Sequence, residues 1–299
     1  MPELPEVEVV RAGLEPAVSG ATIAGVEVFD ERSLRRHAGA GNDFVDRLTG
    51  AQIVGASRRG KFLWLPLLDT PEPHAASALV VHLGMSGQVL LRDRATDDRL
   101  TRIRLEIEHP GHGALRLNFV DQRIFGSMAI DPLVATPDVA GERIPNQVAH
   151  IARDPLDPHF DDARFFTALS RRKTGIKRAM LDQGLISGIG NIYADEALWA
   201  ARIHYDQPTD TLSRPRAKTL LAEVRLVLAK ALAEGGTSFD AQYVNVNGAS
   251  GYFSHSLNAY GQQGRDCPRC GRAIVRESFM NRGSHFCPFC QRLRLRPAG

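Results

Sequence analysis

The chain falls into two stretches that differ in the spacing of their hydrophobic residues. Between residues 21 and 130, apolar residues alternate with polar ones or form short runs, and glycines and charged residues separate these runs. The runs are TIAGVEVF, AQIVGAS, KFLWLPLL, ALVVHL, GQVLLR, RIRLEI, ALRLNFV and IFGSMAI. This pattern predicts several short antiparallel strands in a sandwich or a barrel.

After residue 160 the apolar residues recur at helical spacing. Asp161 or Asp162 is a candidate N-cap for a helix over FFTALSRRKTGIKRAMLDQ, and Ser213 is one for RPRAKTLLAEVRLVLAKALAE. The two glycines that follow the second segment should end its helix. Residues 131–160 are rich in Pro and Asp and predict a linker between two domains, in agreement with the length of 299 residues.

Composition and charge narrow the class of protein. Hydrophobic residues make up 43% of the chain and charged residues 24%, which is typical of a soluble globular protein. No run approaches the roughly 18 apolar residues of a membrane span, and no secretory signal opens the chain, so we expect a cytoplasmic protein. The net charge is +3, with +6 in residues 265–299 and −3 elsewhere. A basic end suits a polyanion, although a solvated basic end is the alternative.

All four cysteines lie in this basic end. They form two Cys-x2-Cys pairs, Cys267 with Cys270 and Cys287 with Cys290, and sixteen residues separate the pairs. The spacing is typical of a structural zinc site in which each pair supplies two thiolates to one tetrahedral ion. Two disulfides are the alternative, which a cytosolic chain with no other cysteine disfavours. Four thiolates close the coordination shell, so the metal would hold a β-ribbon together and take no part in chemistry.

A glycine turn and a helix form a candidate anion site. Gly188 and Gly190 in LISGIGNIYADEALWA open a turn, and NIYADEALWA predicts a helix with Asn191 near its N-terminus. Backbone N–H groups at such an end bind phosphate, and the basic segment RRKTGIKR at 171–178 precedes it. Packing of two helices without a ligand is the alternative.

The N-terminal segment MPELPEVEVV places two prolines and two glutamates around one leucine. Removal of Met1 would leave Pro2 as a secondary amine, with the carboxylate of Glu3 directly after it. Taken alone, these residues indicate a strand or the start of a helix, because proline is tolerated in the first helical turn.

Several motifs occur together and in a fixed order. They are PELPEVE, RRGKFLW, HLGMSG, DQRIFG, SGIGNIYADEALW, GGTSF with NGASGYF, and the four-cysteine end. With these motifs the chain resembles the bacterial formamidopyrimidine-DNA glycosylases, the 8-oxoguanine glycosylase/lyases, over essentially its whole length. The endonuclease VIII branch is less similar, because its members start PEGPE rather than PELPE.

The resemblance implies an α+β multidomain fold with an N-terminal antiparallel β-sandwich, a helix-two-turn-helix domain and a C-terminal four-cysteine zinc-finger β-ribbon. The expected boundaries are 2–132 for the catalytic sandwich, 133–155 for a linker, 156–237 for the helix-two-turn-helix DNA-binding domain, 238–264 for a lesion-recognition loop and connector, and 265–299 for the zinc finger. It further implies a monomer that holds one structural zinc ion and binds double-stranded DNA containing a damaged base.

The resemblance also implies a bifunctional DNA glycosylase/AP lyase that excises oxidised purines, with Pro2 as its nucleophile. An α-amine has a reference pKa of about 7.7–8.0, so much of it is unprotonated at neutral pH, unlike a lysine near about 10.4. Pro2 would attack the anomeric carbon and displace the base, leaving an iminium. Glu3 would protonate the sugar ring or stabilise the developing cation. Elimination of both phosphates would then cleave the strand.

Further roles follow from the resemblance alone. Lys61 in RRGKFLW corresponds to a lysine that contacts phosphate and assists β-elimination, although an ordinary lysine at a strand end is the alternative. Arg282 in FMNRGSHF corresponds to an arginine that grips the phosphates beside the lesion and is assigned to δ-elimination. Three residues of the helical domain correspond to contacts with DNA: Arg172, Lys177 and Asn191.

A third group would fill the gap that the flipped nucleotide leaves: Met85, Arg123 and Phe125. Phe125 would wedge into the base stack and Arg123 would face the orphaned cytosine. Without the resemblance, the methionine and the phenylalanine would be assigned to the core. Glu6 and Glu196 correspond to acidic residues near the active centre, and residues 236–252 to the loop that closes over the flipped base.

Two positions depart from the family pattern. Many relatives carry a DNA-contacting histidine near the start of RIRLEI, where this chain has Leu100 or Thr101, so one phosphate contact is in question. The wedge motif, often Arg-Arg-Phe-Gly, has Ile124 in place of its second arginine. Neither change touches the proposed amine or acid, and we expect an active enzyme.

Three other functions stay open. They are an endonuclease VIII-like glycosylase for oxidised pyrimidines, a catalytically silent zinc-containing DNA-binding protein on the same scaffold, and an N-terminal-proline acid/base enzyme for small keto acids. The joint presence of Pro2, Glu3, Lys61 and Arg282 argues against the silent protein. The keto-acid enzyme would explain the proline but neither the zinc motif nor the phosphate sites.

Overall fold

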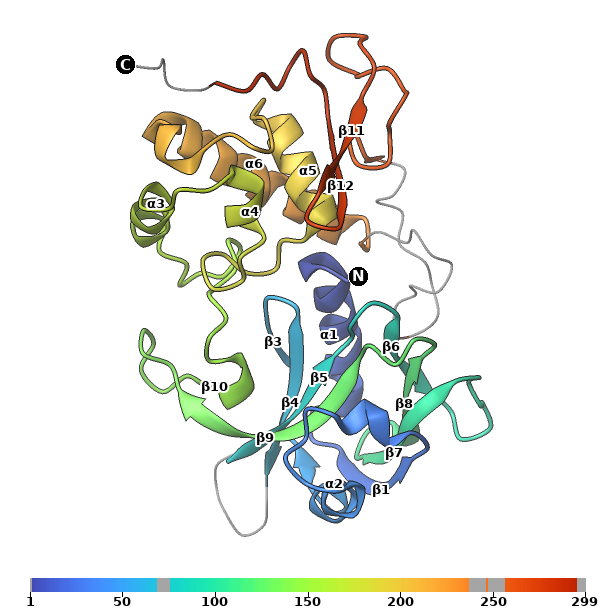
Figure 1. Cartoon of the computed structure of the whole chain (residues 1–299). Coiled ribbons are helices and arrows are strands. Elements are labelled where there is room, and N and C mark those ends of the chain that lie inside the picture. The colour runs from blue at the N-terminus through green and yellow to red at the C-terminus, as the bar shows by residue number, and fades with distance from the viewer. Residues whose placement is uncertain (1, 69–75, 237–245, 247–255, 295–299) are drawn as a thin grey trace. The chain divides into compact units, whose positions relative to one another are not determined.

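The computed structural model describes residues 2–68, 76–236, 246 and 256–294, and the chain forms two compact units (Figure 1). The first unit contains residues 1–150 and 235–251, and the second contains residues 151–234 and 252–299. No helix of the described residues is long and apolar enough to cross a membrane.

The first unit is the predicted antiparallel β-sandwich with helices packed on it (Figure 1). Its strands run in the order β10-β9-β5-β4-β2-β1-β7-β8-β6, and β3 pairs with β4. The helices are α1 (Leu4–Val18), η1 (Glu31–Leu34), α2 (Gly41–Leu48) and η2 (Asn146–Val148). The strands are β1 (Thr22–Val28), β2 (Gln52–Ile53), β3 (Ser57–Arg59), β4 (Phe62–Leu68), β5 (Ser77–His82), β6 (Gly87–Arg92), β7 (Thr101–His109), β8 (Gly113–Asp121), β9 (Ser127–Ala135) and β10 (Arg143–Pro145).

Helix α1 supplies one side of the hydrophobic core of this unit. Val7, Val10, Leu14 and Val18 recur at helical spacing and are buried in one cluster with the alternate residues of the strands. Part of the predicted linker is structured, because β9 and β10 continue the sheet as far as residue 145. The run IFGSMAI, predicted as one strand segment, enters the sheet only at Ser127.

The second unit combines a helical domain with a hairpin that lies between the two cysteine pairs (Figure 1). Its helices are α3 (Asp162–Ser170), α4 (Ile176–Met180), α5 (Asn191–Ala200), η3 (Thr209–Thr211) and α6 (Arg214–Ala233). The hairpin pairs β11 (Val275–Phe279) with β12 (Arg282–Phe286). Ser213 is the N-cap position of α6, as predicted, and Asp161 caps α3 by accepting a hydrogen bond from the Arg164 N–H at 3.0 Å.

The segment predicted as one helix over 165–183 is divided in the structure. Helix α3 ends at Ser170, and α4 begins only after Gly175. The N–H groups of Ile176 and Lys177 donate to the carbonyls of Gln207 and Tyr205 at 2.8 and 2.9 Å. A Cβ atom at residue 175 would collide with the carboxylate of Asp206, so glycine is needed where the two segments approach.

Candidate active site and nucleic-acid interface

In the first unit, Pro2 lies in a small recess that it lines together with Lys61, His82, Leu83 and Gly84. Lys61 lies in the turn between β3 and β4, and the β4–β5 register places Phe62 opposite His82. The sheet therefore brings an N-terminal proline, an ammonium group and an imidazole together from three separate parts of the sequence. Pro2 and Lys61, two of the residues predicted to be catalytic, thus line the same recess.

The segment PELPE forms the N-terminus of α1, where its glutamates accept hydrogen bonds from free backbone N–H groups. Glu3 is the N-cap and is only 2% exposed, and Glu3 and Glu6 form a capping box. Within this box the Glu3 N–H donates to the Glu6 carboxylate at 2.8 Å. The cap fixes the backbone directly after Pro2, and it directs the Glu3 carboxylate to the Glu6 N–H at the start of the helix.

His82 is a site residue that the sequence analysis did not single out, although it opens the motif HLGMSG. Burial, followed by the charges of Arg36, Arg35 and Lys61, lowers the pKa of His82 from 6.5 to about 4. The imidazole is therefore neutral at physiological pH. Its Nδ1 accepts a hydrogen bond from the Gly84 N–H at 3.2 Å, so the proton of the neutral ring lies on Nε2. The same three cations give the surroundings of the recess a positive potential that suits DNA phosphates.

The three residues predicted to fill the gap in the base stack come from two turns of the first unit. Phe125 and Met85 are 47% and 44% exposed, which is unusual for large apolar side chains and excludes a core role for both. The turns touch, because a Cβ atom on Gly84 would collide with the Phe125 backbone. The Asp121 carboxylate closes the second turn by accepting hydrogen bonds from the Arg123 and Gly126 N–H groups at 3.1 and 2.7 Å.

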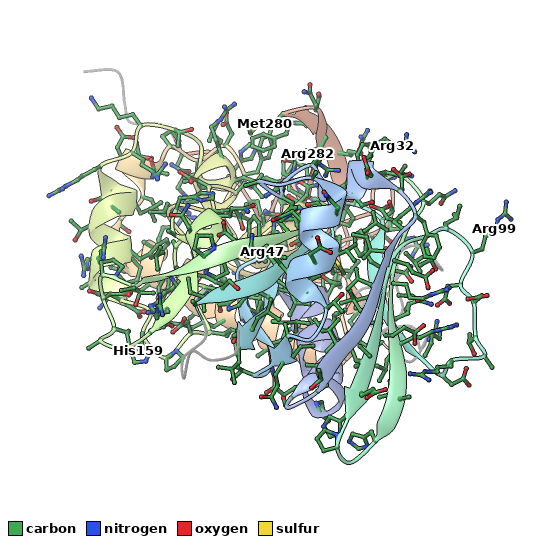
Figure 2. All side chains as sticks on the ribbon, turned by 90° about the horizontal axis from the view of Figure 1, so that it is seen from below. Arg32, Arg47, Arg99, His159, Met280 and Arg282 are labelled. Carbon is green, nitrogen blue, oxygen red and sulfur yellow. The ribbon has the colours of Figure 1, made fainter. Side chains whose placement is uncertain are left out.

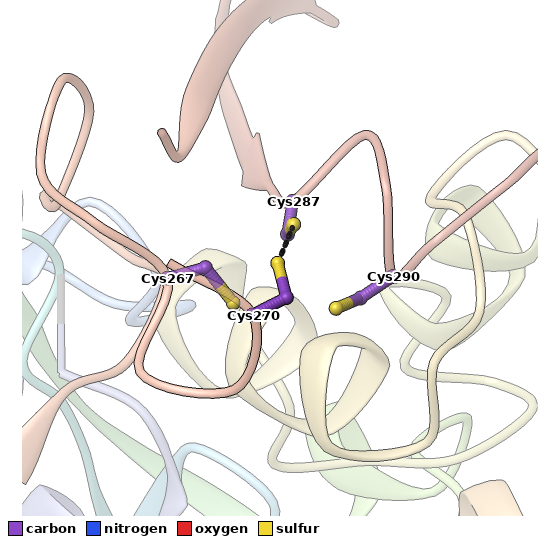
Figure 3. Close-up of side chains that lie close together, drawn as sticks. All are labelled: Cys267, Cys270, Cys287 and Cys290. Carbon is purple, nitrogen blue, oxygen red and sulfur yellow. Dashed lines mark hydrogen bonds between the residues drawn. The ribbon is translucent and has the colours of Figure 1, made fainter. Parts of the chain in front are cut away.

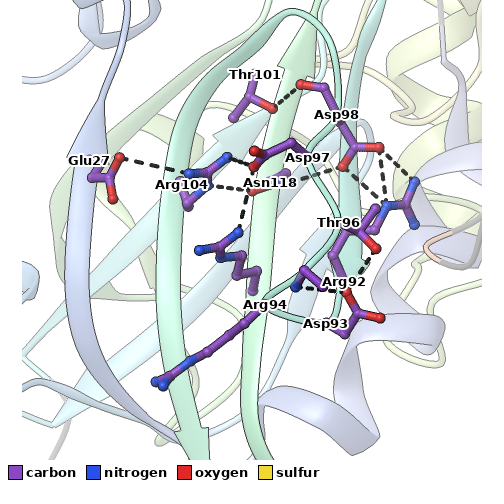
Figure 4. A network of polar contacts seen from close by, with 12 residues as sticks. Glu27, Arg92, Asp93, Arg94, Thr96, Asp97, Asp98, Thr101, Arg104 and Asn118 are labelled. Carbon is purple, nitrogen blue, oxygen red and sulfur yellow. Dashed lines mark hydrogen bonds and ion pairs between the residues drawn. The ribbon is translucent and has the colours of Figure 1, made fainter.

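The position of the missing family histidine lies at the start of β7, beside a network of charged residues (Figure 4). The Thr101 hydroxyl donates to the Asp98 carbonyl at 2.7 Å. The arginines that Figure 4 shows in this network are engaged with acids; Arg92 pairs with Asp98 at 3.0 Å and Arg104 with Asp97 at 2.5 Å. These two arginines therefore do not replace the histidine as a phosphate contact.

In the second unit, Lys177 is fully buried, which differs from the predicted phosphate contact. Its ammonium group lies 2.6 Å from the Asp195 carboxylate and donates to the Ser284 hydroxyl at 2.8 Å and to the Gly283 carbonyl at 3.2 Å. The ammonium group therefore has one carboxylate and two hydrogen-bond acceptors inside the unit. A phosphate contact would require this buried ion pair to open, so the arrangement does not fit that role.

Asp195 connects Lys177 to the zinc-finger hairpin. Its second carboxylate oxygen accepts hydrogen bonds from the backbone N–H of His285 at 2.9 Å and pairs with the His285 ring at 3.1 Å. Asn191, at the start of α5, donates to the Gly283 carbonyl at 3.1 Å. Three helical residues thus hold β12 directly after Arg282, and the phosphate role of Asn191 stays a prediction.

Arg282 stands at the exposed tip of this hairpin, next to Met280 (Figure 2). Met280 and Asn281 form the two-residue connection and have φ values of 45° and 60°. Two consecutive positive φ angles are typical of a type I′ turn, which matches the twist of a hairpin. Arg172, the other predicted DNA contact, is half-exposed and forms an ion pair with Asp182 at 2.6 Å.

The four cysteines meet as predicted (Figure 3). Their sulfur atoms all lie within 4.8 Å of one another, which fits four ligands around one zinc ion. The Trp199 indole N–H donates to the Cys267 sulfur at 3.4 Å, as expected for a thiolate acceptor. Burial, together with the neighbouring thiols, raises the pKa of Cys290 to about 12. A cation is therefore needed for all four groups to ionise together, and zinc supplies it.

Glu196 has a structural role in the second unit. It is 2% exposed, and its carboxylate accepts hydrogen bonds from the backbone N–H groups of Asn258, Ala259 and Tyr260 at 2.8–2.9 Å. Burial raises the pKa of Glu196, and these N–H groups oppose that shift. Of the predicted lesion loop at 236–252, only Gly236 and Val246 lie among the described residues, and Val246 is buried in the core of the first unit.

Comparison with known proteins identifies three domains along the chain. The chain matches the formamidopyrimidine-DNA glycosylase N-terminal domain over residues 1–128 and the formamidopyrimidine-DNA glycosylase H2TH domain over residues 151–242. Residues 266–293 match the zinc finger found in FPG and IleRS. All three matches lie in the order in which the domains were predicted.

Similar proteins cover nearly the full chain. A formamidopyrimidine-DNA glycosylase from Leifsonia xyli is 67% identical over 98% of this chain and 100% of its own length. One from Thermobifida fusca is 55% identical over 97% of each chain. The structure of Lactococcus lactis Fpg with DNA containing an abasic site is similar with a TM-score of 0.80 and 30% identity, covering 97% of this chain and 99% of that one. The chain therefore belongs to the formamidopyrimidine-DNA glycosylase family.

Proposed function

We propose that this chain is a bifunctional DNA glycosylase and AP lyase of base excision repair that uses Pro2 as its nucleophile and excises oxidised purines. Membership of the family supports glycosylase action on damaged DNA. The observation that carries the assignment of the nucleophile is the recess that Pro2 shares with Lys61 and His82. The proposed partner is duplex DNA with a damaged base, in line with the abasic DNA bound by the Lactococcus lactis relative.

The first chemical step is attack of the Pro2 nitrogen on C1′ of the damaged nucleotide. The bond from C1′ to the base breaks, and the base leaves with the bonding electrons and takes up a proton. The sugar ring then opens as the nitrogen lone pair forms the iminium and O4′ takes a proton. Glu3 is the proposed acid, because it follows Pro2 directly in the sequence and is only 2% exposed.

Strand cleavage follows by elimination from the iminium, which acts as an electron sink. Loss of a C2′ proton releases the 3′ phosphate, and a second elimination releases the 5′ phosphate. Lys61 lies beside the recess, where its charge would stabilise a departing phosphate. Neutral His82 offers an Nε2–H donor at the same place without the cost of burying a second charge.

The second unit would bind the DNA backbone through the exposed tip of its hairpin. Arg282 is the proposed phosphate-binding residue at this tip, and zinc held by Cys267, Cys270, Cys287 and Cys290 would keep the hairpin folded. In the first unit, exposed Met85 and Phe125, with Arg123, are proposed to occupy the space of the flipped nucleotide.

The experiment is reduction with borohydride on duplex DNA that contains 8-oxoguanine, followed by mapping of the crosslinked peptide. We expect the crosslink on Pro2, and none in protein with an N-terminal extension, because an acylated nitrogen cannot form an iminium. Glu3→Gln should slow excision by about 10²–10⁴-fold while DNA binding is retained, since it removes an acid and no cation.

Other outcomes of this experiment assign the alternatives. A crosslink on a lysine, or full activity from protein that retains Met1, would contradict the role of Pro2. Faster excision of an oxidised pyrimidine than of 8-oxoguanine would identify an endonuclease VIII-like specificity. Tight DNA binding without any trapping would identify a catalytically silent scaffold.

A further inference from the structure

The turn that presents Phe125 contains a backbone conformation that its sequence disfavours. Ile124 has φ of 56°, in the left-handed region. For a β-branched residue this is a true outlier, because its Cβ crowds the following carbonyl oxygen. Such strain persists only where surrounding contacts impose it, and it is common where a turn must present a functional side chain.

Two sets of contacts fix the ends of this turn without reaching its strained centre. The Asp121 carboxylate binds the N–H groups of Arg123 and Gly126 and is also bound by the Ser86 hydroxyl at 2.5 Å. Gly84 packs directly against the Phe125 backbone. The first contact acts on N–H groups, and Gly84 packs against the Phe125 carbonyl group without a hydrogen bond to it.

Those two carbonyls are bound by Arg35, which lies about ninety residues earlier, directly after η1. One terminal guanidinium nitrogen donates to the Ile124 carbonyl at 2.7 Å, and the other donates to the Phe125 carbonyl. A guanidinium presents its two donors in a fixed planar fork, so it holds a pair of acceptors in one geometry. Charge-assisted hydrogen bonds of this kind are roughly twice as strong as neutral ones.

Arg35 has no competing acidic partner in the part of the chain that the structure describes. Its neighbour Arg32, in the same η1 segment, pairs with Asp30 at 2.7 Å, and no corresponding ion pair is present for Arg35. The Arg35 side chain is exposed, so a buried charge is not the reason for its contact with the turn. Its described hydrogen bonds all go to the turn that carries Phe125.

We propose that Arg35 is a positioning residue for the wedge, which holds the strained Ile124 turn so that the Phe125 side chain stays projected toward the base stack. This inference rests on the proposed function, since it assigns Phe125 to the gap left by the flipped nucleotide. Arg35 acts through the backbone of the turn and does not touch the reacting atoms. Ile124 is β-branched, which makes an external clamp on its left-handed backbone more necessary.

The test compares Arg35→Ala and Arg35→Lys with the matched control Arg32→Ala. Arg32 lies in η1 and Arg35 lies directly after it. Each alanine variant removes one positive charge, so a loss of general attraction to DNA should affect both alanine variants alike. The Arg32 side chain is 73% exposed and does not contact the turn among the described contacts. Two reactions are measured: excision of 8-oxoguanine from duplex DNA, and cleavage at an abasic site in single-stranded DNA, which needs no wedge.

We expect Arg35→Ala to slow duplex excision by about 10-fold or more, because two charge-assisted bonds are lost. Cleavage of the single strand should stay within about twofold of wild type in Arg35→Lys, which keeps the positive charge near the recess. Arg35→Lys should behave like Arg35→Ala in duplex excision, because a lysine keeps the charge but not the fork. Arg32→Ala should resemble wild type in both reactions.

Two further measurements separate positioning from phosphate binding and from general stability. In a Phe125→Ala background, Arg35→Ala should add no further loss of duplex excision, because residues that act as one unit are not additive. Hydrogen exchange at the amides of residues 123 and 126 should speed up in Arg35→Ala and not in Arg32→Ala, with no DNA present.

Additive losses, restoration of duplex excision by Arg35→Lys, or unchanged exchange in the turn would each overturn the inference. Equal loss of both reactions would do so as well, because it would indicate a general defect. Failure of wild-type protein to excise or crosslink would instead refute the proposed function, and the exchange measurement reports on the clamp independently of that result.

Discussion

Two turns of this molecule present an exposed apolar side chain beside an arginine, and they are stabilised in different ways. The turn at 121–126 in the first unit carries Phe125, and the hairpin tip at 279–282 in the second carries Met280. Both contain non-glycine residues with positive φ, namely Ile124 in the first and Met280 with Asn281 in the second. Apolar exposure and backbone strain therefore coincide in both places, as expected for functional turns.

The difference lies in what enforces each conformation. Hydrogen bonds from Asp121 and Arg35 hold the first turn, and they come from a sheet that has a large core of its own. Phe279 and Phe286 of the hairpin pack against the Tyr205 ring, and the hairpin also has a thiolate cluster at its base and the Lys177–Asp195 ion pair beside it. The first turn therefore depends on a unit with its own hydrophobic core, whereas the second depends on a metal ion and a buried ion pair.

Removal of zinc should have the largest effect, and it should unfold the hairpin while leaving the 121–126 turn intact. Structural zinc supplies about 10–16 kcal/mol in zinc-finger peptides, so a chelated protein or Cys287→Ser should lose the hairpin outright. The amides of β11 and β12 should exchange freely, while those of the 121–126 turn stay protected. Hydrogen exchange with mass spectrometry measures both, and re-addition of zinc to the chelated protein is the control. A hairpin that stays protected in metal-free protein would contradict this dependence.

Lys177→Met should have the next largest effect, again confined to the second unit. The substitution leaves the Asp195 carboxylate buried without its cation, which typically costs about 3–5 kcal/mol. The double variant Lys177→Met, Asp195→Asn removes that charge but keeps an acceptor for the His285 N–H, so it should recover most of the loss. Urea unfolding of both variants, with zinc content measured in parallel, is the test. Equal destabilisation by the two variants would show that the charge is not the cause.

Much of the fold was predictable because local patterns specify it. Alternation along residues 21–130 predicted the strands, and the cysteine spacing predicted the cluster at residues 267–290. The break between α3 and α4 was not predictable, because it depends on the contact of Gly175 with Asp206, thirty-one positions later in the sequence. Short-range periodicity carries no information about such a partner.

The absence of information about distant partners also explains which site residues could be predicted from the sequence. In the first unit Pro2 and Lys61 share a recess, and their predicted roles stay predictions. Lys177 differs, since a lysine in a basic segment gives no sign that an acid on α5 will neutralise it in the interior. Arg35 and His82 were missed because their partners are set by strand register and by a turn far along the chain.

Acid should weaken the first unit through His82, with a smaller effect than either change above. Its pKa is about 4 in the folded protein and 6.5 ordinarily, so the unfolded chain binds the proton first as the pH falls. The stabilising contribution is complete above pH 6.5 and is lost progressively between pH 6.5 and 4. At about 1.4 kcal/mol per pKa unit, the loss is about 3 kcal/mol.

Protonation would also add a hydrogen to His82 Nδ1, which now accepts the Gly84 N–H, and would therefore disturb the turn packed on Phe125. His82→Gln removes the titrating group, so its unfolding free energy should fall less steeply than that of wild type between pH 6.5 and 4. Urea unfolding at pH 7, 5 and 4 measures the difference between the two proteins. Wild type and His82→Gln both release zinc in acid, so this loss does not contribute to the difference between them. If the unfolding free energies of the two proteins fell in parallel with pH, the pKa of His82 would be the same in the folded and unfolded chain. That result would contradict a neutral His82 ring that accepts the Gly84 N–H.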